Sequence, residues 1–170
     1  MNKLNNNLNN YLIVTRGAPA SGKSTFVNDK LYPRFKIVSS DAIRLEIAGL
    51  NENGRISQAA NDRVWGILYS KVIQAIRNKQ DVVIDSTAVS KAMIKKYYKI
   101  AQNNKYTFIL LDFSNVSLLQ CLQNNRQREE FRFVPEDVIE RMYNQIKSQE
   151  LGDLEHYVID YKNFNVKDLK

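Results

Sequence analysis

The chain has 170 residues, of which 44% are hydrophobic and 25% charged, a size and composition typical of one globular domain that buries its own core. It contains a single histidine (His156) and a single cysteine (Cys121), which excludes a histidine-dependent triad, a multi-histidine metal site, an internal disulfide and a cysteine-rich zinc site. The formal net charge of +7 permits a polyanionic partner, because positive potential attracts phosphate chains, although a basic solvated surface explains the same charge.

The amino terminus differs in composition from the rest of the chain. Residues 1–10 include six asparagines and little that would bury, which predicts a disordered leader before a single domain spanning residues 11–170. No run of about 18 or more apolar residues is present, and the first residues lack the apolar core of a signal peptide. We therefore expect a cytoplasmic protein with no membrane contact.

The remaining sequence alternates short apolar runs with amphipathic segments. The apolar runs predict five strands, at residues 11–15, 36–40, 81–85, 108–113 and 156–160. Helices are expected between them: from the first glycine-rich loop to Pro33, from about residue 42, over 58–78, over 90–102, over 117–124 and from Pro135. This alternation predicts a three-layer α/β fold with a five-stranded parallel sheet. Cys121 lies among leucines and is interpreted as a core residue.

A glycine-rich loop follows the first predicted strand. The pattern Gly-x-x-x-x-Gly-Lys-Ser matches at Gly17, Gly22, Lys23 and Ser24, and a strand before and a helix after it are typical of a P-loop. The glycines let backbone amides turn toward phosphate oxygens, and the helix presents its free amides and the positive end of its dipole. Lys23 is expected to reach the β- and γ-phosphates, and Ser24 to bind Mg²⁺.

The predicted ATP-binding residues of this loop are Gly17, Ala18, Pro19, Ala20, Ser21, Gly22, Lys23, Ser24 and Thr25. Hydrolysis of ATP or GTP without transfer to an acceptor is the alternative that this loop leaves open.

Asp41 follows the second predicted strand and is the candidate for the residue that positions or deprotonates an attacking hydroxyl. With histidine unavailable, a carboxylate beyond the carboxyl end of a strand is the natural base for phosphoryl transfer. Arg44 comes three residues later, so at helical spacing it can face the same cleft and contact a phosphate. The alternative is an ordinary helix cap beside a surface arginine.

Asp85 ends the third predicted strand, in the crevice where open α/β sheets bind ligands. It is a candidate for the Mg²⁺ site or the acceptor site, with a structural cap of the next turn as the alternative. The segment 126–132 contains three arginines between two predicted helices. It is interpreted as a lid whose guanidinium groups, Arg126 and Arg128 among them, offset charge on the transferred phosphoryl group; a solvated loop is the alternative.

Over residues 11–145 these motifs resemble the polynucleotide 5′-hydroxyl kinases of phage and bacterial nucleic-acid end-healing systems. The resemblance rests on the loop ending in Gly-Lys-Ser-Thr, on Ser40-Asp41-Ala42-Ile43-Arg44, on Val83-Ile84-Asp85-Ser86-Thr87, and on Asn125-Arg126-Gln127-Arg128 followed by Val134-Pro135. The sequence departs from the family pattern at Ala20, Ala88 and Asn124.

The resemblance implies a role for each matching residue. Lys23 and Ser24 would bind the phosphates and Mg²⁺, and Asp41 would be the general base. Arg44 would contact the phosphate of the acceptor end. Asp85 and Thr87 would contribute to the acceptor site, and Arg126 and Arg128 would belong to an arginine-bearing lid.

These observations predict a P-loop kinase fold and an Mg²⁺-dependent enzyme that transfers the γ-phosphoryl group of ATP to the 5′-hydroxyl end of RNA or DNA. End-healing enzymes such as a ligase or a phosphatase are the partners that this function implies. The alternatives are a kinase for a small-molecule hydroxyl, such as a sugar, nucleoside or antibiotic, and a non-enzymatic nucleotide-binding domain. Asp41 argues against the last of these, because a pure switch needs no acceptor base.

Overall fold

A computed structural model describes residues 10–170, so most of the predicted leader lies outside the described residues. The centre of the fold is one five-stranded sheet in the order β2-β3-β1-β4-β5, with every neighbouring pair parallel. The strands are β1 (Tyr11–Arg16), β2 (Lys36–Ser39), β3 (Val82–Asp85), β4 (Thr107–Asp112) and β5 (Val158–Asp160). This arrangement confirms the predicted α/β fold with its five-stranded parallel sheet.

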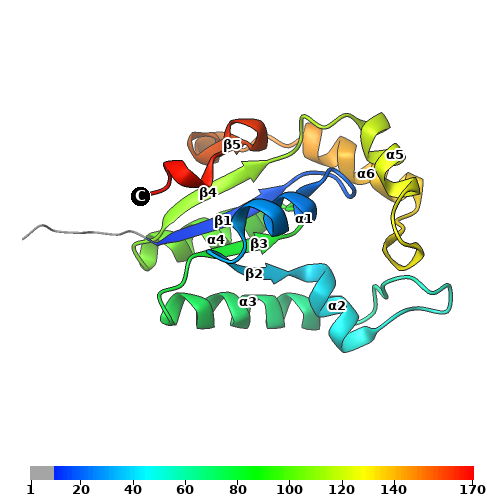
Figure 1. Ribbon diagram of the computed structural model, residues 1–170, viewed down its shortest axis with the longest axis horizontal. Helices are drawn as coiled ribbons and strands as arrows, with labels where there is room; N and C mark the ends of the chain where they lie inside the picture. The colour runs from blue at the N-terminus through cyan, green and yellow to red at the C-terminus, as the bar shows by residue number, and fades with distance from the viewer. Residues whose placement is uncertain (1–9) are drawn as a thin grey trace, which may run out of the picture.

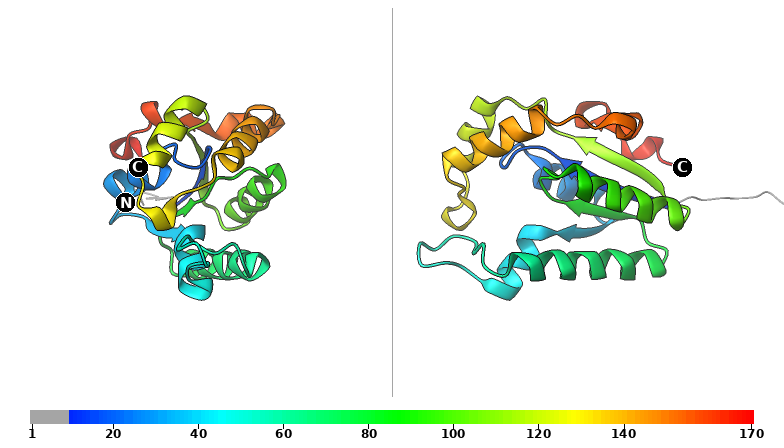
Figure 2. Two further views of the ribbon diagram at one scale, coloured as in Figure 1. Left: turned by 90° about the vertical axis from the view of Figure 1, so that its right-hand side faces the viewer. Right: turned by 180° about the vertical axis from the view of Figure 1, so that it is seen from behind.

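The connections between the strands are helical, as parallel pairing requires. The α-helices are α1 (Lys23–Phe26), α2 (Ser40–Ala48), α3 (Asn61–Arg77), α4 (Lys91–Asn103), α5 (Leu118–Arg126) and α6 (Glu136–Lys147). A π-helical turn, Val27–Leu31, continues α1. Figures 1 and 2 show helices on both sides of the sheet, with α5 and α6 together at one end of it.

The helices bury apolar side chains on both faces of the sheet, which makes the fold three layers thick. On one face, Leu68 of α3 and Ile94 of α4 pack with Leu12 and Leu110 of the central strands. On the other face, the turn that continues α1 packs with the opposite side chains of the same strands, such as Ile13. Because neighbouring residues of β1 point to opposite faces, Leu12, Ile13 and Val14 are apolar on both sides of the strand, and the buried Thr15 and Arg16 have polar partners.

The carboxyl-terminal residues complete the second face. Tyr161 stacks on Phe113 with ring centroids 4.4 Å apart, and Phe26 meets Phe113, Tyr161 and Phe164 edge to face. Phe26 belongs to α1, so these aromatic contacts attach the helix that follows the P-loop to the end of the chain.

Most boundaries differ from the predicted ones by one to three residues, and three of the differences bear on residues singled out in the sequence. Helix α2 begins at Ser40, because the side chain of Ser39 accepts a hydrogen bond from the Ala42 amide and caps it there, and this places Asp41 in the first helical turn. Arg126 ends α5 instead of standing in the segment between helices. His156 and Tyr157 belong to a 3-10 turn, so β5 is shorter than predicted and begins at Val158.

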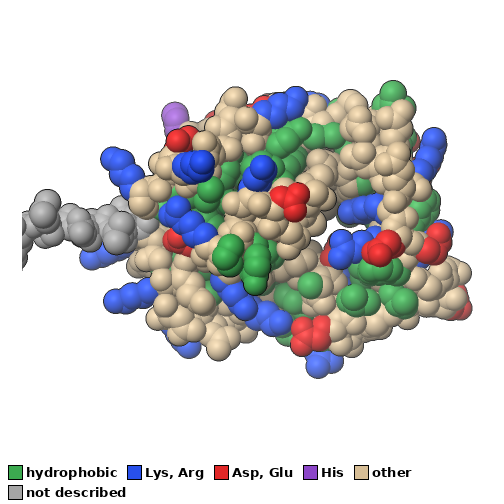
Figure 3. Space-filling model, viewed as in Figure 1, with side chains coloured by type: hydrophobic (Ala, Val, Ile, Leu, Met, Phe, Trp, Pro, Cys, Tyr) green, Lys and Arg blue, Asp and Glu red, His purple; other side chains and the backbone are tan. Residues whose placement is uncertain are grey.

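The carboxyl ends of β1, β2 and β3 point toward the end of the molecule that carries α2, α5 and α6 (Figure 1). There the molecule is hollowed between its body and two projecting segments, the α2–α3 loop and the α5–α6 connection, with Lys and Arg side chains around the opening (Figure 3). Ligands of open α/β sheets bind at this end. Within residues 10–170, no helix is both long and apolar enough to cross a membrane.

Candidate active site

The P-loop joins β1 to α1 and is fixed at its base by contacts with the neighbouring strands. The Gly17 amide donates to the Thr87 carbonyl over 3.1 Å. A β-carbon at Gly17 would lie 2.8 Å from Phe113 Cβ and from Ser21 Oγ, so a larger residue does not fit there. Gly22, at φ 92°, takes the left-handed conformation from which α1 starts. Gly17 is therefore required by lack of space for a side chain, whereas Gly22 is favoured by its backbone conformation.

Ala20 stands where the resembling family more often has glycine, and its φ of 62° is the conformation that glycine would favour. Its carbonyl accepts a hydrogen bond of 2.9 Å from Asn124 Nδ2 of α5. Ala20 and Asn124, two of the three departures from the family pattern, are therefore in contact, and their bond ties the P-loop to the helix that leads to the predicted lid.

Lys23 is buried within the loop that it follows. Its Nζ donates to the carbonyl oxygens of Gly17 and Ala18, 2.9 and 2.7 Å away, and to Ser21 Oγ over 3.2 Å. Burial lowers the pKa of the ammonium group to about 8; the nearby carboxylate of Asp85 opposes this shift and the charge of Arg128 adds to it. A buried cation inside a cradle of backbone groups is suited to meeting a triphosphate.

Ser24 and Asp85 form the second element of the phosphate site. Ser24 Oγ donates to Asp85 Oδ2 over 2.7 Å, and the carboxylate is buried at the end of β3. Burial raises the pKa of Asp85, while the Ser24 hydrogen bond and the charge of Lys23 oppose this rise. A hydroxyl and a carboxylate side by side are oxygen ligands of the kind that Mg²⁺ takes, so these residues fit the metal predicted for them.

Few protein ligands would hold such a metal ion. Residues 10–170 contain no cluster of three or more His, Cys, Asp or Glu side chains that could bind a metal. Mg²⁺ at phosphate sites usually keeps several waters and takes one or two protein ligands together with phosphate oxygens. The Ser24–Asp85 pair meets that requirement.

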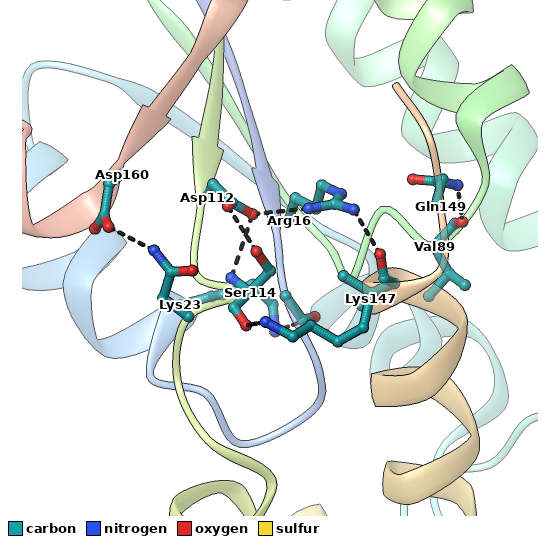
Figure 4. Close-up of polar contacts among 11 residues, drawn as sticks. Arg16, Lys23, Val89, Asp112, Ser114, Lys147, Gln149 and Asp160 are labelled. Atoms are coloured by element: carbon teal, nitrogen blue, oxygen red, sulfur yellow. Dashed lines mark hydrogen bonds and ion pairs between the residues drawn. The ribbon is translucent and has the colours of Figure 1, made fainter. Parts of the chain in front are cut away.

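A buried ion pair lies beneath the P-loop. Arg16, the last residue of β1, pairs with Asp112 of β4 at 3.1 Å and donates to the Ile146 carbonyl of α6 over 2.7 Å. Asp112 also accepts hydrogen bonds from the amide and hydroxyl of Ser114. Figure 4 shows Arg16 between Asp112 and the end of α6, where Lys147 reaches toward Ser114. These contacts join the start of the P-loop to α6.

Asp41 and Arg44 lie on α2 and contact each other. Arg44 donates to Asp41 Oδ1 over 3.3 Å and to Asn61 Oδ1 over 2.8 Å, and its guanidinium lies 5.6 Å from the ring centre of Trp65. The Asp41 side chain is 66% exposed whereas that of Arg44 is 10% exposed. The carboxylate is thus open to an acceptor, and the arginine that orients it is buried, unlike the surface arginine of the alternative reading.

The arginines of the predicted lid point in different directions. Arg126 pairs with Glu136 of α6 at 2.8 Å and is exposed. Arg128 is half-buried, and its NH1 donates to the Arg132 carbonyl over 3.3 Å. Burial lowers the pKa of Arg128, and the carboxylates of Asp41 and Asp85 oppose this shift.

The structure therefore gathers Lys23, Ser24, Asp85, Asp41 and Arg128 at one end of the sheet. Arg126 pairs with Glu136, and Thr87 accepts a hydrogen bond from the P-loop through its backbone carbonyl. The prediction did not include two partners of Arg44, Asn61 and Trp65, because they follow it by 17 and 21 residues and belong to no local motif. Arg132, whose charge acts on Asp85, stands in the same arginine-rich segment, so composition alone points to it.

Comparisons with known proteins identify the family and the fold. A family model described as "AAA domain" matches residues 12–149. The chain is similar to a chain of the Pnkp1/Rnl/Hen1 RNA repair complex, with 21% identity and a TM-score of 0.64 over 86% of this chain and 47% of that chain. It is also similar to a gluconokinase from Sinorhizobium meliloti 1021, with 17% identity and a TM-score of 0.55 over 88% of this chain and 81% of that one.

A third similar structure is that of AvrRxo1-ORF1:-ORF2 with ATP, with 18% identity and a TM-score of 0.63 over 89% of this chain and 51% of that chain. The chain thus spans about half the length of the repair-complex and AvrRxo1 chains that it matches. No curated protein matches it by sequence. The fold is the P-loop kinase fold predicted from the sequence, and it supports kinase activity and ATP binding.

The buried ion pair beneath the P-loop yields a stability prediction. Replacing Asp112 with alanine leaves the Arg16 guanidinium buried without its carboxylate, so the free energy of unfolding should fall by about 3–5 kcal/mol. Urea denaturation at neutral pH measures this change. Glu46→Ala is the matched control, because it removes an exposed pair with Lys71 and should cost less than about 1 kcal/mol. An equally small loss for Asp112→Ala would contradict the role given to this pair.

The lowered pKa of Lys23 predicts a pH dependence of ATP binding. The free protein loses the Lys23 proton as the pH rises through about 8, whereas bound phosphates raise the pKa and retain the proton. ATP affinity should therefore fall as the pH rises above about 8, by at most about tenfold per pH unit, with proton uptake on binding. Calorimetry in two buffers of different ionisation enthalpy measures both. Lys23→Met should lack the effect, and a wild-type affinity that stays constant from pH 7.5 to about 9.5 would contradict it.

Proposed function

We propose that this chain, which belongs to the AAA domain family, transfers the γ-phosphoryl group of ATP to the 5′-hydroxyl end of an RNA or DNA strand. The observation that carries this proposal is the exposed carboxylate of Asp41 beside a complete P-loop. A domain that only binds nucleotide needs no such acceptor base. We further propose that residues 11–170 act as one kinase domain.

The donor half of the reaction uses the P-loop. Lys23 leaves the carbonyl oxygens of its own loop and binds the β- and γ-phosphates, where its charge stabilises the phosphoryl group during transfer. Ser24 and Asp85 would hold Mg²⁺, which when bound neutralises charge on the phosphate oxygens. Arg128 contributes a further positive charge from the lid side of the same cleft.

The acceptor half uses α2. Asp41 accepts the proton of the attacking hydroxyl, and Arg44 holds the carboxylate in place through the contact at 3.3 Å. Asn61 and Trp65 in turn fix the guanidinium plane of Arg44. The positive charge of Arg44 also attracts the phosphate that follows the terminal nucleoside of a polynucleotide, which distinguishes such an acceptor from an uncharged small molecule.

The net charge of +7 and the Lys and Arg side chains around the opening favour a polyanionic acceptor (Figure 3). The second candidate is phosphorylation of a small-molecule hydroxyl, which the likeness to most of the length of a gluconokinase favours. End-healing enzymes such as a ligase or a phosphatase are the partners that we propose for the polynucleotide activity, since one similar chain belongs to an RNA repair complex.

The direct test is transfer of labelled phosphate from ATP to a panel of 5′-hydroxyl oligonucleotides and small hydroxyl compounds. We expect oligonucleotides to be labelled, and Asp41→Asn to lower kcat by roughly a hundredfold or more while ATP affinity is kept, because the amide preserves the shape of the carboxylate without its basicity. Labelling of small compounds alone would replace the polynucleotide proposal with the second candidate. A kcat unchanged in Asp41→Asn would remove Asp41 from catalysis.

A second test concerns Arg44. If its charge attracts the acceptor phosphate, Arg44→Ala should raise the KM for an oligonucleotide, and this KM should depend less steeply on salt than in the wild type, because one phosphate contact is lost. The measurement is KM at several salt concentrations for both proteins. Arg63→Ala, which changes an exposed arginine of α3 at the same net charge, is the matched control. Identical salt slopes for Arg44→Ala and wild type would assign Arg44 to orienting Asp41 alone.

A further inference from the structure

The loop between α2 and α3 has an ordered conformation that presents Arg55. Leu50 and Ile56 form an antiparallel bridge, and the Asn51 amide donates to the Arg55 carbonyl over 2.7 Å. The Asn51 side chain accepts hydrogen bonds from the amides of Asn53 and Arg55, which closes the turn between them. The backbone of Arg55 is therefore fixed by hydrogen bonds within its own loop, independently of its contacts with other segments.

Arg55 and Ile56 bind the tip of the lid, across the opening from α2. Arg55 Nε and NH2 donate to Glu130 Oε1 over 3.3 and 3.2 Å, and the guanidinium lies 4.4 Å from the ring centre of Phe133. The Ile56 amide donates to the Phe131 carbonyl over 2.8 Å. These three contacts involve the 3-10 turn η2 (Glu130–Arg132) and Phe133, the residue that follows it.

The base of the lid is fixed separately. Asn125, fully buried in α5, donates to the Val134 carbonyl over 2.7 Å and accepts from the Val134 amide over 3.0 Å. These two bonds close residues 125–134 into a loop whose ends cannot move apart. These two bonds do not fix the tip of the loop. Arg55 and Ile56 contact the tip and can hold it in position.

The turn that Arg55 holds also carries the groups that face the nucleotide. Arg128 NH1 donates to the Arg132 carbonyl over 3.3 Å, so the orientation of Arg128 depends on where η2 lies. The charge of Arg132 acts on the pKa of Asp85, that of Arg128 acts on the pKa of Lys23, and the Asp85 carboxylate acts on the pKa of Arg128. A displacement of the tip would thus move positive charge away from the phosphate site.

We infer that Arg55 is a positioning residue: by gripping Glu130 and Phe133 it holds the lid turn so that Arg128 and Arg132 face the P-loop. The inference rests on the proposed function. It also means that the loop after the acceptor helix α2 and the lid over the nucleotide are joined into one closed rim, visible around the opening at this end of the molecule (Figure 3).

The kinetic test uses a double-mutant cycle. Arg55→Ala should lower kcat for phosphoryl transfer by roughly tenfold or more, since small displacements of a charged group that stabilises the transition state have effects of this size. The same substitution should have no further effect where Arg128 and Arg132 are already alanine. Lys71→Ala, which breaks an exposed ion pair between α2 and α3 away from the lid, is the matched control and should leave kcat unchanged.

The outcomes separate the roles that Arg55 can have. Arg55→Lys keeps the positive charge and should therefore have a higher kcat than Arg55→Ala. If Arg55 served folding alone, Arg55→Ala would lower the melting temperature and leave kcat per folded enzyme unchanged. Equal losses of kcat from Arg55→Ala in both backgrounds would overturn the inference, because Arg55 would then act independently of the lid arginines.

Hydrogen exchange gives a readout that needs no acceptor. With a non-hydrolysable ATP analogue bound, the amides of residues 128–133 should exchange faster in Arg55→Ala than in the wild type or in Lys71→Ala. Failure of the proposed function would show as absence of labelled oligonucleotide with lid protection still dependent on Arg55. Equal protection in wild type and Arg55→Ala would overturn the inference about Arg55 whatever the acceptor proves to be.

Discussion

Three consecutive residues at the carboxyl end of β1 bind both neighbouring strands, and the position of the phosphate site depends on these contacts. The Thr15 hydroxyl donates to the Ser86 carbonyl and accepts from the Ser86 amide beyond β3. Arg16 pairs with Asp112 on the opposite side, and the Gly17 amide donates to the Thr87 carbonyl. Because these polar groups are buried, each must find its partner, which fixes the point where the P-loop leaves the sheet.

Burial of the Lys23 ammonium group in the absence of nucleotide lowers the stability of the folded protein. Lowering the pKa of Lys23 from 10.5 to about 8 corresponds to roughly 3 kcal/mol against the folded state. This cost is complete below pH 8, where folded and unfolded chains are both protonated, and it declines as the pH rises from 8 toward 10.5. A triphosphate supplies the missing negative charge, so the site is organised for a ligand that the fold alone does not satisfy.

Local patterns predicted the fold and the donor half of the site. Strand, glycine loop and helix follow one another directly in the sequence, so Lys23 and Ser24 could be placed from spacing alone. The partners of Arg44 and Arg55 could not, because α2 meets α3, and the α2–α3 loop meets the lid, only in the folded chain. Arg126 is the last residue of α5 whereas Arg128 lies beyond the end of the helix, so the helical spacing that places one side chain does not place the other.

The paired hydrogen bonds of Asn125 with Val134 have a consequence for variation of this protein. They isolate residues 126–133 from the hydrophobic core, much as a disulfide isolates the loop that it closes. A segment attached in this way can change at its other positions while the two attachment points, the contacts of Glu130 and Phe133 with Arg55, and the lid arginines stay in place. The amide of Asn125 thus lets sequence changes in this segment occur without changes in the packing of α5.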